Sequence, residues 1–238
     1  MLSAMKVNNH LAFPTVISQT EHTVSFDEKQ CWFDLYLKHS DSDGKSHDFV
    51  GFESLQTDFN FCDIFMNKLK AGVDEYFKYL NLSLDKLDVQ LTKAFFNVTD
   101  QSGINIHDHA ENHLSFTYYP HIARGKDRNI VFHNYNESHT NEPYPSFFYN
   151  HITEWTGINS AKISYPISEG VLFIFPSKLK HDIEVKQGDT RPDVQSFKDK
   201  QSLERSRFCV AGDMLYTRKP GIEQYNRTLS SPENWRTV

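Results

Sequence analysis

Residues 106–119 read Ile-His-Asp-His-Ala-Glu-Asn-His-Leu-Ser-Phe-Thr-Tyr-Tyr, and this stretch organises the rest of the chain. Three histidines and two carboxylates fall within 107–113, directly before an aromatic run with the character of a strand. Far downstream, residues 170–181 read Gly-Val-Leu-Phe-Ile-Phe-Pro-Ser-Lys-Leu-Lys-His and end in His181. Arg207 then opens the run Arg-Phe-Cys-Val-Ala. A close His-x-His pair, a distant His at a strand end and a later Arg in a strand predict a mononuclear metal site that holds an anionic cosubstrate.

The composition restricts the class of protein. The chain has 238 residues, enough for one large β-rich or mixed domain or for two small ones. It carries 19 Phe, 11 Tyr and 3 Trp, whose large side chains can build a core from relatively few residues. The formal net charge of −6 gives no basic field, so we expect no nucleic-acid partner.

The cysteines and the hydropathy pattern indicate a compartment. The three cysteines, Cys31, Cys62 and Cys209, make no disulfide framework, which is typical of a protein from the reducing cytoplasm. No apolar run approaches the roughly 20 residues that span a bilayer, so we expect no membrane partner. We therefore predict a cytoplasmic protein.

Most of the chain reads as short strands, with one clear helix. Residues 1–60 read as strands and turns, including a strand over 31–37. Apolar residues recur at helical spacing over 61–80, so an amphipathic helix should lie on a sheet, with Gly72 marking either close packing or a break. Further strands are expected over 91–98, 115–119, 129–133, 161–167, 171–175 and 207–211. The predicted fold class is mainly β: a double-sheet, cupin-like jelly roll with supporting α-helices.

The same pattern predicts the domain organisation. Residues 1–220 should form a single domain, with an aromatic insertion at 134–162 that is either functional or mobile. Residues 221–238 should form a polar C-terminal tail.

The spacing of the histidines suits a metal centre. Two residues at i and i+2 on an extended segment project to the same side, so His107 and His109 can both supply a ligand. His181, at the end of an apolar strand, can supply another from across the barrel. Redox-active Fe(II) needs few protein ligands on one face, because O2 and an organic cosubstrate must bind on the other. A buried Arg207 can pair bidentately with a carboxylate of that cosubstrate, which a Lys cannot reproduce.

These residues also carry a resemblance to a known family. His-x-His at 107–109, followed by Ser115 eight residues on and then by Tyr118-Tyr119, resembles a His-x-His…Ser-Gly-Val-Tyr-Tyr signature. Residues 170–181 match Gly-x-Leu-x-x-Phe-Pro-Ser-x-Leu-x-His, and 207–211 look like an Arg-x-Ser-x-x strand. The family is the 2-oxoglutarate/Fe(II)-dependent oxygenases related to prolyl and aspartyl hydroxylases. The resemblance covers roughly residues 50–215.

The resemblance implies a fold, a cofactor and a reaction. It implies a double-stranded β-helix that holds one Fe(II), with His107 and His181 as ligands and 2-oxoglutarate as the cosubstrate. Arg207 would bind the distal carboxylate of 2-oxoglutarate, and Asn97, which stands where related sequences carry an Asn before the first ligand, is a further contact. The implied reaction hydroxylates a C–H bond of a peptidyl side chain or a small amino-acid-like molecule, with release of succinate and CO2.

Strand alternation selects further candidates for the cosubstrate site. It puts Ser115, Thr117 and Tyr119 on one face of the predicted strand, with Tyr118 on the other. The polar set is the better wall for an anionic cosubstrate. We therefore favour Thr117 and Tyr119 over Tyr118 as cosubstrate-binding residues.

The third metal ligand has several candidates. The wider superfamily carries Asp or Glu at i+2, where this chain has His109. Asp108, at i+1, should point away from an extended segment, and Glu111, at i+4, reaches the metal only if the segment turns. His109, one of the two carboxylates, or no third protein ligand are therefore the alternatives.

Two other functions fit the same pattern. A cupin-type three-His metalloenzyme would keep the metal but not use 2-oxoglutarate, and its Arg207 would be structural. A non-catalytic jelly-roll binding or structural protein would carry its histidines incidentally. The remaining histidines of the site region and beyond are interpreted as structural: His113, His121, His133, His139 and His151.

Overall fold

The computed structural model describes residues 15–41, 45–46, 49–52, 54–100, 102–126, 128–134, 153–154, 160–184, 197–221, 229 and 231–234. The predicted insertion at 134–162 and the predicted tail at 221–238 lie largely outside these residues. The division of the chain into these parts therefore stays a prediction.

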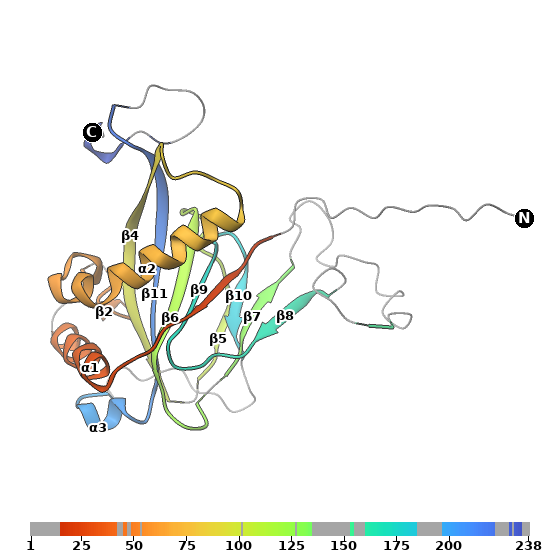
Figure 1. Cartoon of the computed structure of the whole chain (residues 1–238). Helices are drawn as coiled ribbons and strands as arrows, with labels where there is room; N and C mark the ends of the chain where they lie inside the picture. The colour runs from red at the N-terminus through yellow and green to blue at the C-terminus, as the bar shows by residue number, and fades with distance from the viewer. Residues whose placement is uncertain are drawn as a thin grey trace, which may run out of the picture.

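Two antiparallel sheets form the frame of the molecule (Figure 1). Within the described residues the larger sheet has seven strands, in the order β1 (Ser18–Glu21), β9 (Val171–Pro176), β6 (Leu114–Ile122), β11 (Arg207–Arg218), β4 (Leu87–Thr99), β3 (Phe49–Val50) and β2 (Lys45–Ser46). The smaller sheet, counted in the same way, has four strands, in the order β5 (Ile104–His107), β10 (His181–Ile183), β7 (Ile130–His133) and β8 (Lys162–Tyr165). The predicted mainly β class is confirmed.

Helix α2 (Phe59–Tyr79) lies across the larger sheet, as Figure 1 shows. It confirms the helix predicted over 61–80. Its N-cap is Asp58, whose side chain accepts a hydrogen bond from the Asn60 N–H and so satisfies one of the free amides of the first turn.

Gly72 lies in the middle of α2 without breaking it. A Cβ atom at this position would lie 2.9 Å from Ile174 Cδ1 and 3.0 Å from Leu172 Cδ2, both on β9. Of the two expectations for this glycine, close packing of the helix on the sheet is therefore confirmed.

The strand expected over 31–37 is wrong, because this stretch lies in helix α1 (Phe26–Ser40). Ser25 caps the helix by accepting a hydrogen bond from the Glu28 N–H, and acidic residues in the first turn favour the helix dipole. Trp32 and Tyr36, one turn apart, are both buried, so the apolar residues follow a helical period that the aromatic content of the segment concealed. The remaining helices within the described ranges are short: η1 (Leu55–Thr57), α3 (Lys200–Leu203) and η4 (Pro232–Asn234).

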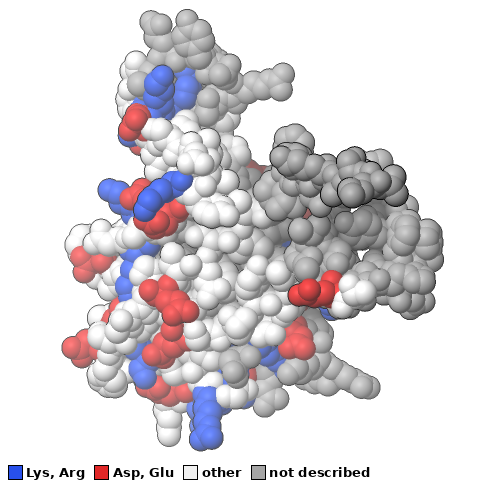
Figure 2. Space-filling model, turned by 45° about the vertical axis from the view of Figure 1, so that its right-hand side comes forward, with Lys and Arg blue, Asp and Glu red and all other residues white. Residues whose placement is uncertain are grey.

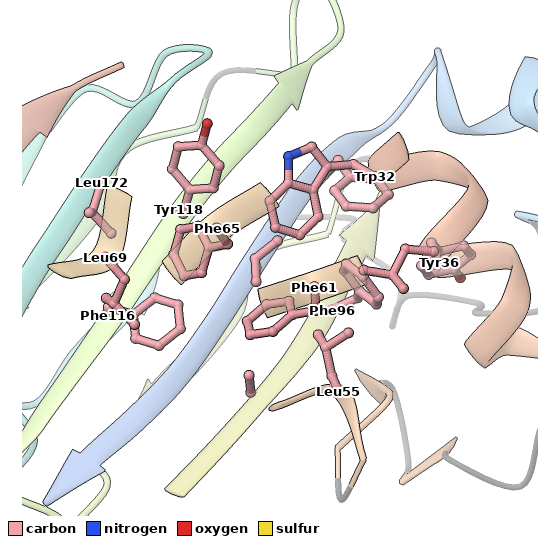
Figure 3. Packing of buried hydrophobic residues seen from close by; sticks show 14 of the residues in the cluster. Trp32, Tyr36, Leu55, Phe61, Phe65, Leu69, Phe96, Phe116, Tyr118 and Leu172 are labelled. Atoms are coloured by element: carbon pink, nitrogen blue, oxygen red, sulfur yellow. The ribbon is translucent and has the colours of Figure 1, made fainter. Parts of the chain in front are cut away.

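Two hydrophobic clusters hold these layers together. The first lies between the helices and the larger sheet, where Trp32, Phe65 and Tyr118 meet (Figure 3). The ring centroids of Trp32 and Phe65 are 5.8 Å apart, in the edge-to-face arrangement that aromatic pairs favour. The second cluster lies between the two sheets and includes Phe132 of β7 and Phe175 of β9. The ring centroids of these two residues are 4.9 Å apart.

Strand β6 presents a different set of side chains to each side of its sheet. Leu114, Phe116 and Tyr118 belong to the cluster under the helices. Ser115, Thr117 and Tyr119 line a cavity between the sheets. The alternation predicted from the sequence is confirmed, and it directs a row of polar groups towards the space between the sheets.

Acidic and basic side chains are interspersed over the described part of the face that Figure 2 shows. None of the helices in the described ranges is long and apolar enough to cross a membrane.

Candidate metal centre

Three histidines converge at one end of the cavity. His107, His109 and His181 each offer one ring nitrogen, and these three atoms lie within 4.8 Å of one another. His107 ends β5 and is paired in register with His181, which begins β10. His109 lies two residues beyond β5, where its main-chain N–H donates to the Ser177 carbonyl at 2.8 Å. The predicted convergence of the His-x-His pair with His181 is therefore present.

The second nitrogen of each imidazole is already occupied. His107 Nδ1 lies 2.8 Å from the Asn105 carbonyl, and His181 Nδ1 lies 2.9 Å from the Leu179 carbonyl. A carbonyl only accepts, so both Nδ1 atoms carry the proton and leave the Nε2 lone pair for a metal. His109 Nδ1 lies 2.6 Å from a carboxylate oxygen of Asp213, with the same consequence.

Burial keeps the imidazoles of His107 and His181 neutral. It lowers the pKa of His181 to about 3, with the neighbouring His107 adding to the effect, and it also lowers the pKa of His107. A neutral imidazole is the form that binds a metal ion. The donor set therefore fits a divalent transition metal, since imidazole nitrogen suits Fe(II), Zn(II) and their neighbours.

The cavity has a volume of about 490 Å³ and runs from the histidines to Arg207. Arg207 is 2 % exposed, and its Nη2 donates to the Ser102 carbonyl at 3.2 Å. Asn97, Thr117 and Tyr119 also line the cavity and are buried. The structure thus brings together the four residues that the sequence suggested for a cosubstrate.

Asn97 adds an observation that points to a ligand. The residue is 3 % exposed, and its Oδ1 atom has no hydrogen-bond partner among the described residues. It lies on β4 in register with Cys209, two residues from Arg207 on β11. A buried polar atom without a partner is costly, so it favours a bound polar molecule beside Arg207.

The carboxylates considered as third ligand do not join the histidines. Asp108 and Glu111 line the cavity, but within the described residues the group of potential ligands consists of the three histidines. Glu111 is exposed. Among the alternatives from the sequence, the geometry favours His109.

Three of the histidines interpreted as structural, His113, His121 and His133, have partners among the described residues. His113 stacks on Tyr216 and accepts a hydrogen bond from the Tyr216 main chain. His133 pairs with Asp182 at 2.6 Å. His121 Nδ1 lies 3.3 Å from Glu169, while His139 and His151 lie outside the described residues.

A charged group that was not predicted from the sequence lies behind the site. Asp213 is fully buried on β11, in contact with His109, and Lys93 Nζ lies 2.7 Å from its second oxygen. Asp213 follows Arg207 by six residues, and an even spacing along one strand places two side chains on the same face of the sheet. This spacing is the feature of the sequence that could have indicated Asp213. Phe49 and Phe52, which also line the cavity, were not predicted as site residues either.

Comparison with known proteins identifies the fold. No protein-family model and no curated protein matches the chain. Among solved structures, the non-heme alpha ketoglutarate dependent carbocyclase SnoK from nogalamycin biosynthesis is similar with a TM-score of 0.52 and 11% identity, over 88% of this chain and 84% of that one. The epimerase SnoN in complex with Fe3+, alpha ketoglutarate and nogalamycin RO gives 0.49 and 10%, over 87% and 83%. HygX from Streptomyces hygroscopicus with nickel and 2-oxoglutarate gives 0.46 and 9%, over 85% and 81%. The predicted double-stranded β-helix with supporting helices is confirmed.

Proposed function

We propose that this protein is an Fe(II)/2-oxoglutarate-dependent dioxygenase with His107, His109 and His181 as its metal ligands. The observation that carries the proposal is the orientation of the imidazoles, because each Nδ1 contacts an acceptor and each Nε2 remains for a metal. A bound metal would supply the activation of O2. In balance, 2-oxoglutarate, O2 and a substrate R–H give succinate, CO2 and R–OH.

Arg207 would bind the distal carboxylate of 2-oxoglutarate. Arg207 is 2 % exposed, so an ion pair with a carboxylate there is little screened by solvent. Asn97, Thr117 and Tyr119 would complete the polar end. Burial raises the pKa of the Tyr119 hydroxyl, so it stays protonated and able to donate to an anion.

The remainder of the cavity suits the apolar part of a substrate. Phe49, Phe52 and Phe95 line it, and Phe49 and Phe95 have ring centroids 4.8 Å apart. These rings exclude water from the C–H bond to be oxidised. We infer hydroxylation of a peptidyl side chain or a small amino-acid-like molecule that places an apolar group against them.

One observation favours a second function. Because the ligand group consists of imidazoles, the site also suits a cupin-type three-His metalloenzyme that does not use 2-oxoglutarate. Arg207 distinguishes the two functions, because only the first function requires it to bind a cosubstrate. The second predicts iron-dependent O2 consumption without succinate.

The test is anaerobic titration of the protein with Fe(II) and 2-oxoglutarate. The proposal expects a weak charge-transfer band in the visible that needs both components. Arg207→Leu should lose the band at the same 2-oxoglutarate concentration and still bind Fe(II). Arg205→Leu, which removes an exposed guanidinium two residues away, should keep both. A wild-type protein that binds Fe(II) but gives no band at saturating 2-oxoglutarate would favour the three-His alternative.

A further inference from the structure

We propose that Asp213 is a positioning residue for His109 and supplies, from behind the imidazole, the negative charge that the three-His ligand set lacks. This inference rests on the proposed function in one respect: the three histidines must bind a divalent metal. It goes further by assigning a role to a residue outside the ligand set.

The sheet places Asp213 directly behind the site. In register, Asp213 of β11 lies between Lys93 of β4 and Ser115 of β6, so the three side chains form one row across the larger sheet. The Ser115 hydroxyl donates to Asp213 Oδ1 at 2.7 Å, and His109 Nδ1 lies 2.6 Å from the same oxygen. The carboxylate is fully buried.

His109 is held from both its side chain and its main chain. Its N–H donates to the Ser177 carbonyl, while the Ser177 hydroxyl is hydrogen-bonded to Ser115 at 2.9 Å. Ser115 in turn contacts Asp213. The four residues therefore close a ring of contacts that sets the position and the tautomer of the imidazole.

The charge behind His109 distinguishes it from the other two histidines. His107 and His181 rest on neutral backbone carbonyls, whereas His109 rests on a carboxylate. A carboxylate hydrogen-bonded to a ligating imidazole makes that imidazole a stronger donor. His109 is also the position at which a direct carboxylate ligand would complete a two-His, one-carboxylate triad.

A structural role as the partner of Lys93 is the competing explanation. Lys93 Nζ contacts Oδ2 of Asp213, but it also lies 4.8 Å from the centre of the Phe52 ring and is partly exposed. The other oxygen, Oδ1, is shared by His109 and Ser115. The two explanations differ in what happens to metal affinity when the charge alone is removed.

The experiment is anaerobic titration with Co(II), whose visible bands report both affinity and coordination geometry. Asp213→Asn keeps the shape of the side chain and removes its charge, and it should weaken Co(II) binding about 10- to 100-fold with altered bands. Asp58→Asn is the matched control, because Asp58, like Asp213, contacts one histidine and one lysine, His39 at 3.0 Å and Lys38 at 2.6 Å, and His39 is not a member of the ligand group. It should leave the affinity within about threefold.

A double-mutant cycle tests whether Asp213 acts through His109. In a His109→Gln background, Asp213→Asn should produce no further loss of Co(II) affinity. Equal losses in both backgrounds, or wild-type affinity and bands in folded Asp213→Asn, would overturn the inference. If Asp213→Asn does not fold, Ser115→Ala applies, since it removes a contact of Asp213 and none of the metal ligands. It should weaken binding at least about threefold, and unchanged affinity would overturn the inference.

The result also separates this inference from the proposed function. Wild-type protein that binds no Co(II) or Fe(II) stoichiometrically overturns both. Wild-type protein that binds metal together with an unaffected Asp213→Asn variant overturns the role of Asp213 alone.

Discussion

His107 and His181 face each other in register across β5 and β10, and their ring centroids are 4.3 Å apart. The candidate centre is therefore built into the pairing of two strands of the smaller sheet. His109 is added from the loop that follows β5, and its main chain is held by Ser177. A metal bound at this place would bridge both strands and the loop.

His181→Ala should remove metal binding. His181 is 5 % exposed and carries one of the three nitrogens that lie within 4.8 Å of one another, so its loss opens the centre to water. We expect a loss of Fe(II) or Co(II) affinity of about 100-fold or more, measured by anaerobic titration. His133→Ala, on the adjacent strand β7, is the control and should bind metal normally. Stoichiometric, tight binding by His181→Ala would place the metal elsewhere.

Lys93→Met should destabilise the metal-free protein and increase the stabilisation that metal provides. Lys93 contacts the buried Asp213 at 2.7 Å, so its removal leaves a carboxylate with fewer partners. We expect a loss of about 2 kcal/mol in the free energy of unfolding, measured by urea denaturation in the presence of a chelator. A bound divalent cation should recover part of that loss, because it compensates the same charge.

Lys78→Met is the comparison for this prediction. Lys78 pairs with Glu75 on the surface of α2, and both side chains are more than half exposed. Its removal should change stability by less than about 0.5 kcal/mol, with or without metal. Equal effects of the two substitutions would mean that Lys93 does not support Asp213.

Much of the fold could be predicted from local patterns in the sequence. Helix α2 and the two faces of β6 follow from periodicity alone, because each pattern is complete within one element. The aromatic residues of helix α1 suit a strand equally well, so they do not distinguish the two structures; the capping signal at Ser25 and Glu28 is what indicates a helix.

The candidate site also contains some residues that the sequence indicates and others that only the structure shows. His107, His109 and His181 could be selected because ligand spacing and strand ends are visible in the sequence. The partners of the His107 and His181 Nδ1 atoms could not be predicted in this way, because Asn105 and Leu179 contact them through main-chain carbonyls, which every residue has. Asp213 becomes recognisable only when the register of β11 places it beside Ser115 and behind His109.

Acid should destabilise the protein through the cap of α2. Burial alone would raise the pKa of Asp58, but contacts with Lys38 and His39 and the Asn60 N–H hold it below its usual range. A lowered pKa in the folded state means that the contribution is present above the unfolded value of about 3.9 and is lost as the pH falls through the folded value.

The variant Asp58→Asn isolates this contribution. Asn also caps helices, so the change removes the charge and keeps the cap. At pH 7 it should lower the free energy of unfolding by about 1 kcal/mol, and the difference from wild type should shrink steadily below pH 4. Urea denaturation across this range measures it, and a difference that grows towards low pH would contradict the assignment.

Arg207→Lys should weaken 2-oxoglutarate binding without removing the positive charge. Lys cannot form the two parallel hydrogen bonds by which Arg holds a carboxylate, so we expect a loss of affinity of about 10-fold or more, intermediate between wild type and Arg207→Leu. The 2-oxoglutarate dependence of the visible band in anaerobic Fe(II) protein measures this. 2-Oxobutyrate, which has the 2-oxo acid group but no distal carboxylate, supplies the internal comparison. Wild-type protein should discriminate strongly against it, and Arg207→Leu should bind the two acids about equally. If wild-type protein binds both acids equally, Arg207 does not contact the distal carboxylate.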